Sequence, residues 1–397
     1  MREEVVIVDA IRTPIGNMGG TLKDISGEDL ACLVLKALLE RTKLDPAAVD
    51  EVIVGQTKIS ADAPNIARTA ALMAGVPIEV PAYTVSRQCG SGLQAVNSGA
   101  QAIMSGQAEV VLAAGTESMS NAVFYLRQAR YGYRSGNGVL VDSNTESQFR
   151  SQPQDMFGVF NMGMTAENLA EKYRIAREEQ DLFAFRSQEK ANKAIQTGRF
   201  KEEIVPVPVK QKKGEPLLFD TDEFPKQTTL EKMAKLPPAF KEGGTVTAGN
   251  SSGRNDGASA LLLMSAKRAQ REGLKPLAVL RSQAAVGVDP RIMGIGPVNA
   301  SRKALELAGL KLNQIDLIEL NEAFAAQSLA CIKELDLDQS IVNVNGGAIA
   351  LGHPLGCTGA RIMTTLLYEM KRRKARYGLA TLCVAGGLGL ADVVELV

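Results

Sequence analysis

The sequence has few of the residues that hold metals and form disulfides. Its 397 residues include one histidine, His353, and no C-x-x-C pair; the five cysteines are scattered as Cys32, Cys89, Cys331, Cys357 and Cys383. A zinc site and a disulfide framework both require clustered cysteines or histidines. We therefore expect no metal, no disulfide and a reducing compartment such as the cytoplasm.

The chain also lacks net charge and long apolar runs. Lys and Arg number 45 against 44 Asp and Glu, so no overall field attracts nucleic acid or an acidic membrane surface. Apolar runs such as "ASALLLMSA" are too short to cross a bilayer. The start "MREEVVIVDA" is acidic and enters a strand-like run, so we expect neither a signal peptide nor a transit peptide. Partners must be recognised at local sites.

An internal repeat is the main structural signal. "LKALLERTKLDPAAVDEVIVGQ" and "SRKALELAGLKLNQIDLIELNEA" each predict an amphipathic helix, a turn and an apolar strand, with Asp316 following Asp50 by 266 residues. At nearly the same spacing, "CGSGLQAVNSGAQAIM" falls opposite "GHPLGCTGARIMTTLL", with Gly92 opposite Gly359. Alternating strands and helices favour sheets covered by helices. The sequence thus predicts an α/β protein made of two duplicated halves whose glycine-rich helices pack closely.

The repeat divides the chain into parts. We expect one half over residues 1–120, an inserted loop domain with a return into that half over 121–250, a connecting segment over 251–275 and the second half over 276–397. The insert combines polar, turn-rich stretches with one strongly helical stretch, "TAENLAEKYRIAREEQDLFAFRSQEKANKAI". Such a segment is typical of a lid or substrate-facing lobe.

Two glycine-rich turns hold candidate reactive groups. Cys89 precedes "GSG" and a helix, where backbone N–H groups and the helix dipole favour a thiolate. A free cysteine taken alone is more often a small buried residue, and that alternative stays open. His353 lies between Gly352 and Pro354 in a turn before a helix, and histidine is suited to move protons near neutrality. The repeat makes the two turns counterparts, so they can meet.

Two further candidates follow strands. Asn321 comes after "DLIEL", where it is either a helix cap or a group that holds a water or an oxyanion. Cys383 ends "LATLC", either as a buried strand residue or as an acid or base at the ligand-binding edge of a sheet. The stretch "TVTAGNSSGRNDGAS" reads as a tight connection rich in hydrogen-bond donors, without the G-K-[ST] of a phosphate-binding loop.

Together these motifs resemble the thiolases. "CGSGLQA", "AGTESMS", "NMGMTAEN", "TAGNSSGRNDGA", "NEAF", "GGAIALGHPLGCTGAR" and "CVAGGLG" occur in that family's order across essentially the whole chain. The resemblance implies the thiolase fold, in which two duplicated α/β halves form a five-layered αβαβα arrangement with an inserted loop domain. It also implies reversible transfer of an acyl group between coenzyme A (CoA) thioesters, with no permanently bound cofactor.

The resemblance assigns roles to particular residues. Cys89 would accept the acyl group, His353 would activate it, and Cys383 would remove or return a proton at the methyl carbon of acetyl-CoA. His353 and a water on Asn321 would hold the thioester oxygen of the second substrate. The oxyanion at the acyl-cysteine would face the backbone N–H groups of Cys89 and Ala385.

The same resemblance gives expectations for binding and assembly. Acyl-CoA and CoA would contact five residues along the pocket, namely Met162, Ser252, Gly253, Ala323 and Phe324, with Ser252 near the pantetheine arm. We expect a homodimer or homotetramer. Cys357 is interpreted as a packing residue, with a hint about substrate range.

Departures from the family pattern bear on the substrate. Ala385 stands where the family usually has glycine, and it retains the backbone N–H. Asn161 stands where members that make acetoacetyl-CoA usually carry histidine. "RQCGSG" and "GHPLGCTGAR" lean toward longer-chain 3-ketoacyl-CoA thiolases of fatty-acid β-oxidation. Condensation of two acetyl-CoA to acetoacetyl-CoA, or the reverse cleavage, is the main expectation, and the longer-chain enzyme is the alternative.

Three other activities are alternatives to that of a thiolase. A decarboxylating ketosynthase typically uses two histidines, or histidine and asparagine, with its cysteine. A cysteine hydrolase built on Cys89, His353 and Asn321 would need no Cys383 and no CoA. A non-catalytic lipid carrier would have lost reactive groups that are present here.

Overall fold

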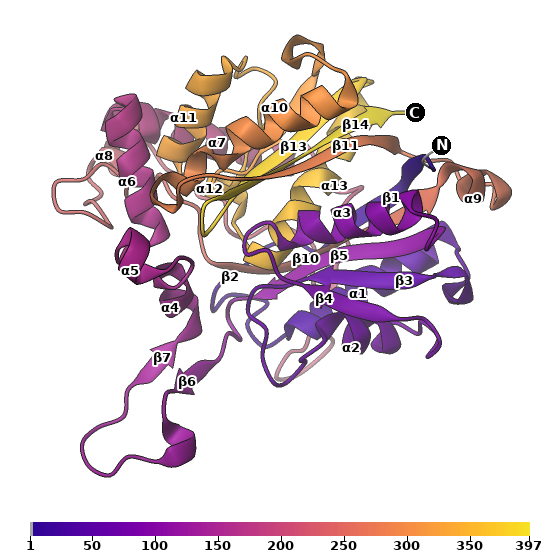
Figure 1. The fold of residues 1–397 in the computed structure, drawn as a ribbon, viewed down its shortest axis with the longest axis horizontal. Coiled ribbons are helices and arrows are strands. Elements are labelled where there is room, and N and C mark those ends of the chain that lie inside the picture. The colour runs from indigo at the N-terminus through magenta and orange to yellow at the C-terminus, as the bar shows by residue number, and fades with distance from the viewer. Residues whose placement is uncertain (1–2) are drawn as a thin grey trace.

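The computed structural model describes residues 3–397. Two sheets and three layers of helices alternate in it, as Figure 1 shows: α1 and α2 lie outside one sheet, α3 and α13 lie between the sheets, and α10 and α11 lie outside the other. This is the expected five-layered α/β fold. Within residues 3–397, no helix is both long and apolar enough to cross a bilayer.

The first half is built on a five-stranded sheet. Its strands run in the order β1-β10-β5-β3-β4, with the short β2 pairing β10. β3 is parallel to β4 and β5, whereas β10 is antiparallel to β5 and β1. The bounds are β1 Val5–Arg12, β2 Gly16–Asn17, α1 Gly27–Thr42, β3 Glu51–Gly55, α2 Ile66–Met73, β4 Ala82–Val85, α3 Ser91–Met104, β5 Val110–Ser118 and β10 Asn255–Ser265.

The second half repeats this topology. Its strands run in the order β12-β13-β14-β11, with β12 parallel to β13 and a parallel bridge from Ile318 to Val342 in the place of β4. A short pairing of Val6 with Val279 and Ile7 with Ala278 joins the two sheets. The bounds are β11 Ala278–Gly287, α10 Gly296–Ala308, β12 Leu317–Leu320, α11 Ala325–Leu335, α12 Ala348–Leu351, α13 Leu355–Arg373, β13 Tyr377–Val384 and β14 Leu388–Leu396.

The aspartates that first revealed the repeat occupy equivalent places. Asp50 Oδ2 accepts hydrogen bonds from the backbone of Glu109 and Val110, at 2.7 and 2.9 Å, where β5 begins. Asp316 Oδ2 accepts from Arg376 and Tyr377, at 2.8 and 2.9 Å, where β13 begins. Each carboxylate therefore fixes the start of the strand that follows a glycine-rich helix, β5 after α3 and β13 after α13.

Glycines let α3 and α13 touch in the middle layer. A Cβ on Gly92 would lie 2.7 Å from the carbonyl oxygen of Gly356, and a Cβ on Gly359 would lie 2.2 Å from the backbone nitrogen of Leu93. Real Cβ atoms do not approach backbone so closely. The close packing expected from the small residues is confirmed, and it brings the N-terminal ends of the two helices together.

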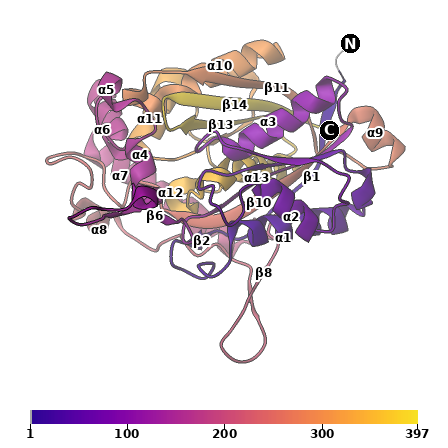
Figure 2. The same ribbon diagram turned by 60° about the horizontal axis from the view of Figure 1, so that its bottom comes forward.

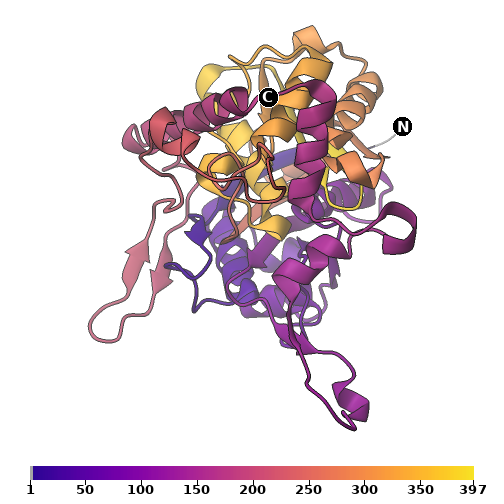
Figure 3. The same ribbon diagram turned by 90° about the vertical axis from the view of Figure 1, so that its left-hand side faces the viewer.

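The insert carries most of the remaining elements. Two hairpins project from the body (Figures 2 and 3), β6 with β7 and β8 with β9. The bounds are β6 Phe124–Leu126, β7 Leu140–Asp142, α4 Ser143–Phe149, α5 Gln154–Phe157, α6 Met162–Tyr173, α7 Arg177–Gln196, β8 Val207–Val209, β9 Leu217–Phe219 and α8 Leu230–Ala234. The insert therefore covers one end of the two-sheet body.

The segment 251–275 differs from the expected connection. It contains β10, an eleven-residue strand between β1 and β5 that is buried along its whole length, followed by α9 Ala266–Arg271. The run "ASALLLMSA" is continuous rather than alternating because helices cover both faces of this strand. Tertiary position, which a local pattern does not contain, makes the segment part of the first sheet.

Candidate active site

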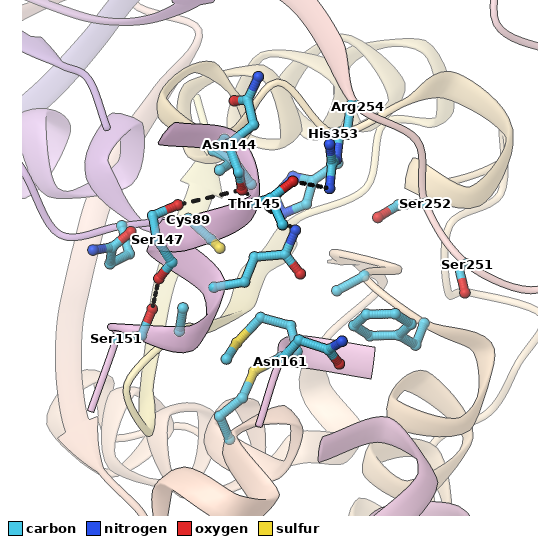
Figure 4. A pocket seen from close by; sticks show the side chains of 18 of the residues that line it. Cys89, Asn144, Thr145, Ser147, Ser151, Asn161, Ser251, Ser252, Arg254 and His353 are labelled. Atoms are coloured by element: carbon cyan, nitrogen blue, oxygen red, sulfur yellow. Dashed lines mark hydrogen bonds between the residues drawn. The ribbon is translucent and has the colours of Figure 1, made fainter. Parts of the chain in front are cut away.

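The two glycine-rich turns open onto one cavity. Cys89 precedes α3, and Gln88 before it adopts a left-handed backbone conformation, φ 45°, that is uncommon for a residue other than glycine. His353 precedes α13, and Cys383 is the second-to-last residue of β13. All three line a cavity of about 270 Å³, part of which Figure 4 shows from close by. The sequence-predicted meeting of the two turns is therefore observed.

Most of the other expected site residues also line this cavity. They are Met162, Ser252, Gly253, Ala323, Phe324 and Ala385. Asn321 is not among the lining residues; it is buried behind His353, with its Nδ2 atom 3.5 Å from His353 Nε2. Cys357 lies fully buried on α13 outside the cavity lining, as expected for packing.

His353 is held in one orientation by two neighbours. Its backbone N–H donates to Asn255 Oδ1 at 2.9 Å, and its Nδ1 lies 2.6 Å from the Thr358 hydroxyl. That hydroxyl donates its own proton to the carbonyl of Pro354 at 2.9 Å, so we assign the proton between the two groups to Nδ1. Nε2 then carries the lone pair, which is the form that a base requires.

Burial keeps the reactive groups of this cavity neutral at rest. Burial, assisted by the positive charge of Arg361, lowers the pKa of His353 to about 3. Burial also raises the pKa of Cys89, although hydrogen bonds from the backbone N–H groups of Ala385 and Cys89 act in the opposite direction. The pKa of Cys383 is raised well above its usual value, mainly by burial and next by the proximity of Cys89. The helix-favoured thiolate expected at Cys89 is therefore outweighed by burial, and the thiol needs a base.

The lowered pKa of His353 predicts a measurable effect on stability. Between pH 6.5 and 5 the unfolded chain protonates this histidine and the folded chain does not, so stability falls as the pH falls. We expect wild type to lose about 1.6 kcal/mol more than His353→Gln over this range, since the unfolded histidine is already half protonated at pH 6.5. Urea unfolding of both proteins at several pH values checks this. Because the buried carboxyls are common to both proteins, their contributions cancel, and parallel pH profiles would contradict the assignment.

Asn321 does not cap the following helix. The N-cap of α11 is Phe324, which makes no side-chain capping bond. The backbone of Asn321 is fixed by its N–H, which donates to Thr381 O at 3.0 Å. Its side-chain Oδ1 is buried and has no hydrogen-bond partner among the described residues. A buried carbonyl oxygen of this kind is suited to accept a hydrogen bond from a water or a substrate group.

The expected CoA-contacting residues form one wall. The backbone N–H of Ser252 donates to Ala323 O at 3.0 Å, and Ser251 pairs with Phe324 in an isolated antiparallel β-bridge. The rings of Phe240 and Phe324 pack edge to face, with centroids 5.9 Å apart. A loop of the first half and the turn after β12 of the second half thus make a continuous, partly aromatic surface beside Cys89.

Ala385 fits its turn without strain. It lies before Gly386 and Gly387, whose φ values of 91° and 85° require glycine, but Ala385 itself is not in the positive-φ region. Its backbone N–H reaches the Cys89 thiol, as noted above. The alanine therefore preserves the donor while placing a methyl group on the cavity wall.

Sequence reasoning missed three supporting residues. Asn255 and Thr358 orient His353, and both lie inside motifs in which neither residue was singled out. Glu117 accepts hydrogen bonds from Lys58 N at 3.0 Å and from Gly356 N at 2.9 Å, which links the end of β5 to the start of α13. Their only sequence signal is a polar residue beside a glycine-rich turn.

Comparisons with known proteins agree with this fold. Residues 5–267 match the thiolase N-terminal domain and residues 274–396 match the thiolase C-terminal domain. An acetyl-CoA acetyltransferase of Pseudomonas aeruginosa is 56% identical over 98% of both chains. The crystal structure of the Bacillus anthracis acetyl-CoA acetyltransferase superposes with a TM-score of 0.97 at 48% identity, covering 100% of this chain and 99% of the other. That of human mitochondrial 3-ketoacyl-CoA thiolase in complex with CoA gives 0.94 at 45% identity, covering 100% and 98%. The chain belongs to the thiolase family.

Proposed function

We propose that Cys89, His353 and Cys383 carry out the acyl transfer of a thiolase. The chain is an acyltransferase of CoA thioesters. The observation that carries the assignment of roles is that two thiols and the single histidine, from both halves of the chain, line one cavity. Cys89 lies far from His353 and Cys383 in the sequence, and the packing of the two duplicated halves brings all three to this cavity.

In the first half-reaction Cys89 is the nucleophile. Nε2 of His353 removes the thiol proton as sulfur attacks the carbonyl carbon of an acyl-CoA. The bond from that carbon to the CoA sulfur then breaks, and the leaving CoA sulfur takes the proton from Nε2. The resulting oxyanion is stabilised by the backbone N–H groups of Cys89 and Ala385, which already lie within hydrogen-bonding range of the thiol. Losing one preorganised donor of this type costs about 3–4 kcal/mol.

In the second half-reaction Cys383 handles the carbon-bound proton. The Cys383 thiol first passes its own proton to Nε2 of His353, and the thiolate then removes a proton from the methyl carbon of acetyl-CoA. The carbanion attacks the acyl carbon on Cys89, the bond from that carbon to the Cys89 sulfur breaks, and the departing Cys89 thiolate takes the proton from Nε2. The thioester oxygen of this substrate is held by His353 and by a water on Asn321. The unpartnered Oδ1 of Asn321 supports the water-binding role.

The principal substrate that we propose is acetyl-CoA, condensed to acetoacetyl-CoA or formed from it by cleavage. Relatives that are about half identical over their full length carry the name acetyl-CoA acetyltransferase, which supports this choice. CoA would lie along the wall formed by Ser252, Gly253, Ala323 and Phe324, with Met162 beside it. Purified protein is expected to cleave acetoacetyl-CoA when free CoA is present.

A longer-chain 3-ketoacyl-CoA thiolase is the second candidate. The observation in its favour is Asn161, which caps α6 at the cavity wall where acetoacetyl-CoA-making members usually carry histidine. Rates on acetoacetyl-CoA, 3-ketohexanoyl-CoA and longer homologues separate the two. We expect kcat/KM to fall beyond acetoacetyl-CoA; a rate that holds or rises with length would favour the second candidate.

The alternatives without a proton-transferring second thiol fit the cavity less well. A cysteine hydrolase would use Cys89, His353 and Asn321 but leaves Cys383 without a task. A decarboxylating ketosynthase would use a second histidine or an asparagine in that place. A lipid carrier would not need an Nδ1-protonated histidine facing a buried asparagine.

We also propose that the protein is a homodimer or homotetramer. The β6–β7 hairpin projects from the body (Figures 1 and 3) and exposes large apolar side chains, including Phe124, Tyr131 and Leu140. Exposed apolar side chains gathered on one projection favour burial against a second copy. Sedimentation analysis of the protein with and without Tyr131→Ser and Leu140→Ser tests this.

A further inference from the structure

One buried carboxylate beside the cavity has no task in the proposed reaction. Glu322 follows Asn321 directly, and its residue is 2% exposed. Its Oε2 accepts hydrogen bonds from the Ser187 hydroxyl at 2.6 Å and from the backbone N–H of Ile349 at 3.3 Å. Its Oε1 accepts from Asn343 Nδ2 at 2.9 Å. Every donor that it meets comes from a different segment of the chain.

Three separate segments of the chain are joined by this carboxylate, which follows Asn321 directly. Ser187 lies on α7, in the insert. Asn343 also clamps the end of β12, since its Oδ1 accepts from Leu320 N at 2.9 Å and its Nδ2 donates to Leu320 O at 2.8 Å. Ile349 lies on α12, which leads through Gly352 to His353. Glu322 thus connects the turn that bears Asn321 to α7, to the Asn343 turn and to α12.

The fit around the carboxylate is close. A Cβ on Gly347 would lie 2.2 Å from the carboxylate carbon, so only glycine leaves room. The N–H of Gly347 also donates to the Ser187 hydroxyl at 3.0 Å, which orients that hydroxyl proton toward Glu322. A half-buried cation, Lys190, faces the same space and donates to Val342 O at 3.0 Å. The carboxylate is therefore fixed by its neighbours rather than free to turn.

His353 does not depend on these contacts for its orientation. Its ring is held through Thr358, and its backbone N–H is held by Asn255, which lies on a strand of the first half. The Asn321 turn is anchored by the backbone bond to Thr381 and by the Glu322 and Asn343 clamp. Disturbing Glu322 should move Asn321 more than it moves His353.

We propose that Glu322 is a positioning residue that sets the place of Asn321 opposite His353 and couples helix α7 of the insert to it. The inference rests on the proposed role of Asn321 in the second half-reaction. Glu322 touches neither substrate nor reacting atoms in this account. It acts by holding the Asn321 side chain where its water can meet the substrate thioester oxygen.

The test replaces Glu322 by glutamine, which keeps the shape of the side chain. A glutamine amide has a single acceptor oxygen. If that oxygen replaces Oε2, it still accepts from Ser187 and Ile349, but its NH2 group faces Asn343 Nδ2, so the Asn343 donor is left without an acceptor. We expect exchange of acetyl-CoA methyl protons with deuterated water to fall about 100-fold, as for a small misplacement of a catalytic group. Acylation of Cys89 by acetyl-CoA, followed by intact mass, should change less than about threefold, within the usual context-dependence of such effects.

Two further variants separate positioning from general structure. Glu322→Gln added to Asn321→Ala should cause little additional loss of exchange, because a residue that acts through Asn321 has no effect without it. Glu369→Gln is the matched control, since Glu369 is also buried and accepts from an asparagine, Asn345, at 2.8 Å. It should lower the melting temperature without changing the ratio of the two half-reactions.

Two results of these measurements would contradict a positioning role for Glu322. Equal loss of acylation and exchange in Glu322→Gln, or full additivity with Asn321→Ala, would overturn the proposal. If Glu322→Gln does not fold, Ser187→Ala removes one donor only and should show the same selective loss at smaller size. Wild-type protein that shows neither acylation nor exchange would instead refute the proposed function.

Discussion

Replacing Cys89 by alanine is expected to abolish acyl transfer. Removing a nucleophile that forms a covalent intermediate typically lowers kcat by about 10⁴-fold or more. Cleavage of acetoacetyl-CoA with CoA should fall to the background rate, and the protein should no longer gain one acetyl group by mass on incubation with acetyl-CoA. The substitution removes one sulfur from a turn whose backbone is held by α3, so folding should be retained.

Cys357→Ala is the matched control for this experiment. Cys357 is buried at the start of α13, close to the same helix ends, but it does not line the cavity. Its burial raises the thiol pKa to about 12, so it stays a neutral packing group. We expect activity within a few fold of wild type and a stability loss of about 1 kcal/mol for the lost sulfur contact. Wild-type turnover by Cys89→Ala would remove the basis for the nucleophile.

The duplication explains why so much of the site could be inferred from the sequence. A repeat of helix, turn, aspartate and strand predicts the same topology twice, and Asp50 and Asp316 do occupy equivalent strand starts. Once two equivalent glycine-rich turns are placed in two packed halves, the approach of Cys89 to His353 follows from symmetry. Cys383 and Asn321 were already candidates at strand ends, and the resemblance to thiolases then gave each of them a role.

The protonation states could not be predicted in the same way. The sequence places Cys89 at a helix N-terminus, which favours a thiolate, but it does not report how deeply the thiol is buried. The assignment of the proton to Nδ1 of His353 depends on where Thr358 sends its own proton, which is a matter of three-dimensional geometry. Sequence patterns over a few residues contain neither the burial of the Cys89 thiol nor the orientation of the Thr358 hydroxyl.

The segment 251–275 was not recognised as part of the first sheet for a related reason. The stretch after Ser252 has the glycine, asparagine and serine content of a loop, and the loop does end in Asn255. From there the chain becomes β10, which pairs with β1 and β5 on either side. Only the partners, which lie more than a hundred residues earlier in the chain, show that this segment completes the first sheet.

Cys383→Ser is expected to separate the two half-reactions. A serine hydroxyl has nearly the shape of the thiol but is a much weaker acid, so it cannot exchange a proton with the methyl carbon of acetyl-CoA at neutral pH. Exchange into deuterated water should fall by about 10²–10⁴-fold, the usual contribution of a general acid or base. Acylation of Cys89 should remain within a few fold of wild type, because Cys89 and His353 are unchanged. Cys331→Ser, at a fully buried thiol outside the cavity lining, controls for adding a hydroxyl to the core.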